Sequence, residues 1–135
     1  MPCVVCGMMT GQEPQDPLKT AQTLDVHQFE ALGELQPDAR RDMLRQMVGL
    51  FVVEVRDWLT AARVALASAD ASTLGRVAHG LKGVCGTIGA ERMRALAVAL
   101  EHSLAAGRLS DAGPAVDQLD DEFLRVSERL SEYEK

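Results

Sequence analysis

The sequence predicts an all-α protein, an up-down-up-down antiparallel four-helix bundle with a short additional N-terminal helix. Only 4% of the residues are aromatic while 47% are hydrophobic, with alanine and leucine abundant, and this composition favours helices over sheets. Apolar residues recur every three or four positions through four long stretches, which is the spacing of one helix face. The connections between the later stretches are short, so neighbouring helices are expected to run antiparallel.

One domain is expected over residues 23–135, preceded by a flexible tail over residues 1–22. A length of 135 residues fits a single domain, and glycines and prolines interrupt any helical period in the tail. Cys3 and Cys6 have the spacing of half a zinc site, but no second ligand pair follows, so no metal site is predicted. An odd number of cysteines favours a reducing compartment, and a cytoplasmic location is expected.

The first helix is predicted to begin after Asp25 and to end at Gly33. Asp25 can act as the N-cap, and Gln28 three positions later completes a pattern that resembles a capping box. The second helix follows Asp38 and runs to about Ala69. The apolar side of the first helix consists of Val26, Phe29 and Leu32. The core-facing residues of the second helix are Leu44, Val48, Phe51, Val55, Trp58, Leu59, Ala62 and Leu66.

The remaining helices are expected at residues 72–88, at residues 91–105, and from about Asp111 to the end of the chain. Gly107 is a stop signal, and Pro114 fits the first turn of the last helix. The inward-facing residues are Leu74, Val77, Ala78, Leu81, Val84, Cys85 and Ile88, then Met93, Leu96, Leu100 and Leu104, and finally Val116, Leu119, Phe123, Val126, Leu130 and Tyr133.

The third helix carries one histidine, His79, on the side opposite its apolar stripe. Each glycine inside a helix costs about 1 kcal/mol relative to alanine, so a purely structural helix avoids glycine. Glycines beside an exposed histidine therefore suggest that the backbone of a partner must come close. Lys82 lies one turn along from His79. The glycines are Gly75, Gly80, Gly83, Gly86 and Gly89, of which Gly75, Gly83 and Gly86 share the face of His79.

This stretch resembles the signature of the histidine-containing phosphotransfer (HPt) domain family. The family pattern is a histidine, any residue, an aliphatic residue, Lys-Gly, five variable residues and Gly-Ala. The matching residues are His79, Leu81, Lys82, Gly83, Gly89 and Ala90. One departure is Val84-Cys85-Gly86, where small Ser or Ala residues are commoner in the family.

The resemblance extends over roughly residues 24–130. Leu24-Asp25 with Phe29 looks like the first helix of the family. Asp70 looks like the acidic residue that closes the long second helix. The segment from Leu96 to Leu100-Glu101 looks like the LxxxLE pattern of the fourth helix.

The resemblance implies that His79 accepts a phosphoryl group from the aspartyl phosphate of a receiver domain and relays it to another receiver. A neutral imidazole is a nucleophile toward phosphorus, and phosphoryl transfer mainly needs in-line positioning and charge stabilisation. Lys82 would stabilise the phosphoryl charge, and Gly75, Gly83 and Gly86 would admit the receiver loop.

The first helices of the family carry the receiver-docking surface beside the phosphohistidine. Met43, Met47 and Leu50 lie off the core stripe of the second helix and are expected to contribute to such a surface, together with Phe29 or Leu32. Packing under the first helix is an equally open interpretation of these side chains.

No phosphate-binding loop, glycine-rich nucleotide box or Mg²⁺-binding Asp cluster is present, so the chain is not expected to be an enzyme or to need a cofactor. Mg²⁺ is expected only on the receiver.

A net charge of −6 argues against nucleic-acid binding, and no apolar stretch is long enough to span a membrane. The expected partners of this monomer are response-regulator receiver domains and a hybrid sensor histidine kinase.

Three alternatives stay open. One is a chemotaxis-type module that an ATP-binding domain phosphorylates directly; this would require further chain beyond Lys135, and the tail slightly favours a free-standing protein. The second is a four-helix adaptor that binds its partner without phosphorylation. The third is a metal- or redox-responsive protein that uses Cys3, Cys6 and Cys85. Cys85 is expected to be a buried apolar residue, and His27 and His102 are expected to lie on helix surfaces.

Overall fold

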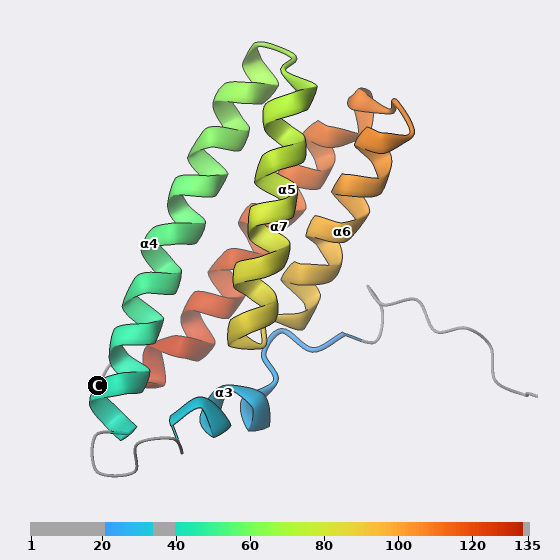
Figure 1. The fold of residues 1–135 in the computed structure, drawn as a ribbon. Helices are drawn as coiled ribbons and strands as arrows, with labels where there is room; N and C mark the ends of the chain where they lie inside the picture. Colours follow the sequence, from blue (N-terminus) through green and yellow to red (C-terminus); the bar gives the residue numbers. More distant parts are fainter. Residues whose placement is uncertain (1–20, 34–39, 134–135) are drawn as a thin grey trace, which may run out of the picture.

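The computed structural model describes residues 21–33 and 40–133, and all regular secondary structure in this part of the chain is helical. Figure 1 shows the long helices packed side by side, with neighbours running in opposite directions. The predicted all-α four-helix bundle with a short additional N-terminal helix is confirmed. The elements are α3 (Val26–Gly33), α4 (Arg40–Ala67), α5 (Ala71–Ile88), α6 (Glu91–Ala105), η2 (Leu109–Asp111), α7 (Ala112–Leu130) and η3 (Ser131–Tyr133).

Local chemistry fixes both ends of α5. The Asp70 carboxylate accepts hydrogen bonds from the backbone N–H and the hydroxyl of Thr73, at 3.1 and 2.6 Å. This N-cap satisfies groups at the start of α5 that have no partner within the helix. The helix ends at Gly89, whose φ of +90° is left-handed and suits glycine. At the preceding connection Ala69 has a φ of +53°, which explains why α4 ends before the predicted boundary.

The predicted capping box at the start of α3 is only half correct. The Asp25 side chain accepts a hydrogen bond from the Gln28 N–H at 3.0 Å, as expected of an N-cap. The Gln28 side chain does not return to Asp25. Its amide donates to the carbonyl oxygens of Gly86 and Thr87, at 2.7 and 3.3 Å, and so caps the last turn of α5. The Asp25 N–H instead donates to the Gly89 carbonyl at 2.7 Å.

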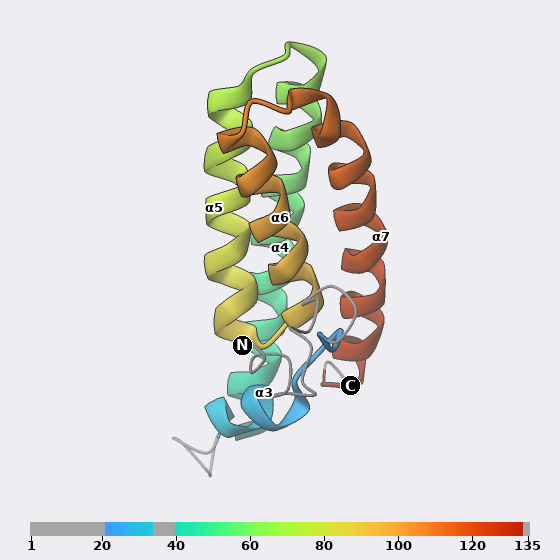
Figure 2. The same cartoon turned by 90° about the vertical axis from the view of Figure 1, so that its right-hand side faces the viewer.

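The short helix α3 covers the end of the bundle where α5 ends and α6 begins (Figure 2). Phe29 is fully buried there and meets Tyr133 in an edge-to-face contact with ring centroids 4.7 Å apart. The Tyr133 hydroxyl donates to Glu30 at 3.0 Å. Burial and this hydrogen bond raise the pKa of Tyr133. The two ends of the domain are therefore held together.

The four long helices share one hydrophobic core, and most predicted inward-facing residues are buried. The predicted core residues that are only partly buried are Trp58, Leu66, Val84, Leu104, Phe123 and Tyr133. Ala65 and Ala112 join the buried set. Close packing of this stripe fixes the rotation of each helix, and so determines which side chains reach the surface.

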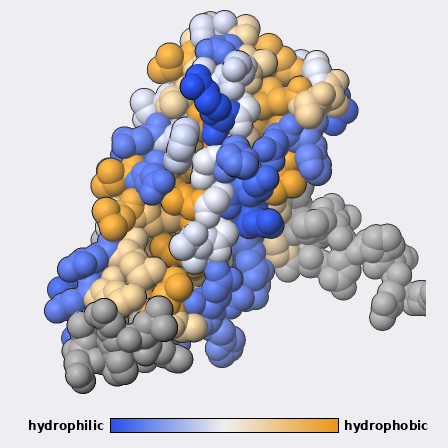
Figure 3. Space-filling view, viewed as in Figure 1, coloured by the Kyte–Doolittle hydropathy of each residue, from blue (hydrophilic) through white to orange (hydrophobic). Residues whose placement is uncertain are grey.

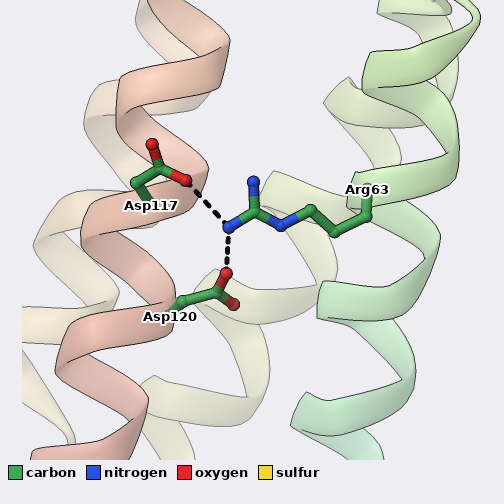
Figure 4. A network of polar contacts seen from close by, with 3 residues as sticks. All are labelled: Arg63, Asp117 and Asp120. Atoms are coloured by element: carbon green, nitrogen blue, oxygen red, sulfur yellow. Dashed lines mark hydrogen bonds and ion pairs between the residues drawn. The ribbon is translucent and has the colours of Figure 1, made fainter.

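Ion pairs link the helices at the edge of the core. Arg63 on α4 reaches across to Asp117 and Asp120 on α7 (Figure 4). These side chains are well exposed, so the pair contributes little to stability. Glu122 is fully buried and is paired with Arg92 at 3.4 Å and Arg125 at 3.1 Å.

Trp58 on α4 lies directly against the backbone of Gly80 on α5. A Cβ atom on Gly80 would overlap the indole ring, whereas one on Gly75 would meet nothing within 4 Å. Gly80 therefore serves the packing of α5 on α4, rather than the approach of a partner.

Replacing Gly80 is expected to damage the fold, and replacing Gly75 is not. Gly80→Ala should lower the free energy of unfolding by about 1–3 kcal/mol, because the new methyl group must displace the Trp58 ring. Gly75→Ala should raise it by up to about 1 kcal/mol, since alanine is the better helix former and the space is open. Urea unfolding followed by circular dichroism measures both values. Equal effects of the two substitutions would contradict this account of Gly80.

Candidate functional site

His79 projects from the middle of α5 into solvent, and its side chain is 73% exposed. The residues on either side of it in sequence are constrained, because Ala78 is fully buried and Gly80 packs on Trp58. The backbone that carries His79 is thus held rigidly while its imidazole is accessible. A nucleophile on a rigid element can be presented in one orientation to a partner.

The imidazole is paired with a carboxylate from the neighbouring helix. Nδ1 of His79 lies 3.4 Å from Oε2 of Glu101 on α6. A carboxylate only accepts hydrogen bonds, so this contact favours the tautomer with the proton on Nδ1. Nε2 then keeps its lone pair. Of the two ring nitrogens, Nε2 is the one available as a nucleophile.

The other oxygen of the same carboxylate holds Lys82. The Lys82 ammonium donates to Glu101 Oε1 at 3.0 Å, and both side chains are about one-third exposed. The hydrogen bond from Lys82, and then the one from His79, hold the pKa of the Glu101 carboxyl below its usual range, against the effect of partial burial. Glu101 is therefore an anion shared by two groups of α5.

The glycines near His79 have different surroundings. Gly75 and Gly83 face open space, and a Cβ on Gly86 would meet the Arg94 side chain at 3.4 Å. Gly89 terminates α5, where a side chain would crowd the Asp25 backbone. With Gly80 packed on Trp58, only Gly75 and Gly83 leave the surface beside His79 entirely free.

A groove between α4 and α5, of about 310 Å³, contains two of the three predicted docking residues of α4. Met47 and Leu50 line it, and Leu50 is 70% exposed. Met43 is half-buried and does not line the groove. The other lining residues are Phe51, Glu54, Val84, Thr87 and Ile88. In the space-filling view apolar side chains gather along α4, beside its boundary with α5 (Figure 3).

The docking surface is predicted to include Phe29 or Leu32, and for Phe29 this prediction is wrong. Its side chain is fully buried against Tyr133 and offers no surface to a partner. Leu32 is partly buried and packs against the core. Val84, predicted to face the core, is partly buried against it and also lines the groove.

The remaining candidate residues take no part in this site. Cys85 is fully buried, and burial raises its pKa to about 12. His27 and His102 lie exposed on α3 and α6, as expected. Within residues 21–33 and 40–133 no three His, Cys, Asp or Glu side chains are arranged to hold a metal ion. Cys3 and Cys6 lie outside the described residues.

None of the described helices is long and apolar enough to cross a membrane.

An exposed histidine on a four-helix bundle, with a lysine one turn away and open glycines beside it, is the arrangement of a phosphoryl-carrier protein. The sequence matches the profile of the Hpt domain over residues 46–129. The chain therefore belongs to the Hpt domain family, and its function is histidine phosphotransfer in a phosphorelay. Members of this family carry phosphoryl groups rather than kinase machinery, and their partners include receiver domains.

A solved structure agrees with this assignment. The chain is similar to the histidine-containing phosphotransfer protein B (HptB) from Pseudomonas aeruginosa PAO1, with 26% sequence identity and a TM-score of 0.77. The similarity covers 85% of this chain and 96% of that one. A comparison with curated proteins gives no match.

The sequence does not predict the contacts that Glu101 and Gln28 make with α5. Glu101 ends the LxxxLE pattern, and that pattern is the signal in the sequence that points to it. Gln28 is predicted only to cap the start of its own helix. Both make their key contacts with α5, and the spacing of residues within one helix does not reveal which neighbouring helix a side chain meets.

Cys85 is expected to be chemically inert in the native protein. Its raised pKa keeps the thiol protonated at about pH 8, and burial blocks access to it. Iodoacetamide should alkylate Cys85 only after unfolding in urea, as measured by mass spectrometry of the peptide that contains it. Rapid labelling of Cys85 in the folded protein would contradict the buried, structural role.

Proposed function

We propose that His79 is the residue that carries the phosphoryl group, through Nε2. The observation that carries this proposal is the pairing of a 73% exposed imidazole with Glu101 through Nδ1, which leaves Nε2 free toward solvent. The other two histidines have no comparable carboxylate and lysine neighbours among the described residues. Their positions on α3 and α6 also lack open glycines on both sides.

The transfer step follows from this geometry. The Nε2 lone pair forms the N–P bond while the bond from phosphorus to the aspartyl oxygen of the receiver breaks. The electron pair of that bond returns to the receiver carboxylate. The Nδ1 proton stays in place, where the anionic Glu101 balances the positive charge that develops on the ring. The reverse step passes the group to a second receiver.

Lys82 and the glycines assist this step. Lys82 lies one turn from His79 on α5, so its flexible side chain can bring the ammonium to the phosphoryl oxygens, as the resemblance to the family implies. Gly75 and Gly83 leave room for the receiver's active-site loop, and Gly86 borders the same surface. Met47 and Leu50 offer an apolar docking surface in the groove, with Met43 at the same end of α4.

The partners of the chain would be receiver domains and a hybrid sensor histidine kinase. The chain itself would need no cofactor and would not be an enzyme, since the Mg²⁺ and the catalytic groups for aspartyl phosphate chemistry belong to the receiver.

We propose that the protein is a monomer and that it lies in the cytoplasm. The single core closed by the chain's own helices supports a monomer, and the odd number of cysteines supports a reducing compartment.

Substitution of His79 should abolish phosphorylation. When the protein is mixed with receiver domains that carry radiolabelled aspartyl phosphate, the wild type should gain acid-labile, base-stable label and His79→Gln should gain none. His102→Gln is the matched control, since it removes another exposed histidine, and it should be labelled like the wild type. Label on His79→Gln would show that another residue carries the phosphoryl group. A folded wild type that no receiver labels would favour the adaptor alternative.

Bulk at Gly83 should slow transfer without harming the fold. Gly83→Leu places a side chain in open space beside His79, so the receiver loop cannot approach and the second-order transfer rate should fall by about tenfold or more. Stability should rise slightly, because leucine is a better helix former. Gly113→Leu, at an open position on α7, controls for the substitution itself and should transfer normally. An unchanged rate for Gly83→Leu would remove Gly83 from the docking surface.

A further inference from the structure

The ammonium group expected to stabilise the phosphoryl group already has an anionic partner. Lys82 donates to Glu101 Oε1 at 3.0 Å, while Glu101 Oε2 contacts His79 Nδ1 at 3.4 Å. Glu101 thus contacts the histidine from the Nδ1 side of the ring. The phosphoryl group would be attached on the Nε2 side. Lys82 in its present position serves the carboxylate, not the reactive nitrogen.

Phosphorylation would change the balance of charge around Lys82. A phosphoryl group brings up to two negative charges and three strong acceptor oxygens, against one charge on Glu101. Lys82 has a long flexible stem and lies one turn from His79 on the same helix, so its ammonium can swing toward the new group. The two anions lie on different sides of the imidazole ring, and they therefore compete for Lys82.

We propose that Lys82 is handed over from Glu101 to the phosphoryl group when His79 becomes phosphorylated, and that Glu101 thereby sets the transfer equilibrium. This inference rests on the proposed role of His79. The handover breaks one ion pair and forms another, with no further covalent change. Glu101 is a positioning residue that acts through Lys82.

The handover offsets part of the stabilisation that Lys82 gives to the phosphorylated state. The Lys82–Glu101 pair has to be broken each time His79 is charged, and it re-forms when the phosphoryl group leaves. A phosphoryl group on His79 is consequently held less firmly than it would be beside an unpaired lysine. This property suits an intermediate that must pass the group on.

A double-substitution cycle tests the handover. The equilibrium constant for transfer from a receiver domain carrying radiolabelled aspartyl phosphate is obtained from forward and reverse rates for the wild type, Lys82→Gln, Glu101→Gln and the double variant. Lys82→Gln should lower this constant in both backgrounds. The loss should be about two- to fivefold larger in the Glu101→Gln background, where Lys82 no longer has to leave a carboxylate.

Arg76 supplies the matched control for charge. It lies three residues before His79 on the exposed face of α5, just as Lys82 lies three residues after it, and its guanidinium contacts Thr73 rather than Glu101. The cycle repeated with Arg76→Gln in place of Lys82→Gln should show no dependence on Glu101. Circular dichroism of each variant checks the fold.

Each other outcome has a definite meaning. An equal loss in both backgrounds would overturn the handover, because the two residues would then not compete. A smaller loss in the Glu101→Gln background would also overturn it, since Glu101 would then be holding Lys82 in place for the phosphoryl group. Failure of the wild type to take label would contradict the proposed function of His79 itself, and the handover with it.

Discussion

The bundle depends on one constraint, the burial of a continuous apolar stripe along α5 between its neighbours α4 and α6. Leu74, Leu81 and Cys85 are fully buried within that stripe, so α5 can neither rotate nor slide without opening the core. The opposite face of the helix is consequently fixed in direction. The placement of His79, and its alignment with Glu101 on α6, follow from the same packing.

Much of this architecture can be predicted from the spacing of apolar residues. The span of α6 and the end of α5 agree with the prediction, and the start of α5 and both ends of α4 differ from it by only one or two residues. The surroundings of the glycines cannot be predicted from this spacing. Gly80, Gly83 and Gly89 look alike in sequence, yet one accommodates Trp58, one faces open space and one ends a helix. The role of Glu101 depends on the packing of α6 against α5, which no pattern within a single helix contains.

The charges of the molecule are distributed in a way that suits the site. The chain has a net charge of −6, but α5 contains no acidic residue between Ala71 and Ile88. Among the described residues, the carboxylate that pairs with His79 belongs to Glu101 on the adjacent helix, and Lys82 partly neutralises its charge. A partner with an acidic active site therefore meets two cations of α5, Arg76 and Lys82, one on each side of His79, on an otherwise acidic protein.

The contact between Trp58 and Gly80 has an optical consequence. Trp58 is the only tryptophan in the chain, and its indole ring touches the residue next to His79 from the inner side of α5. The indole Nε1 is buried and has no hydrogen-bond partner among the described residues, so the emission of the ring depends on the local field and packing. The protein therefore contains an intrinsic fluorophore, and its emission reports on the packing of α4 against the turn of α5 that carries His79.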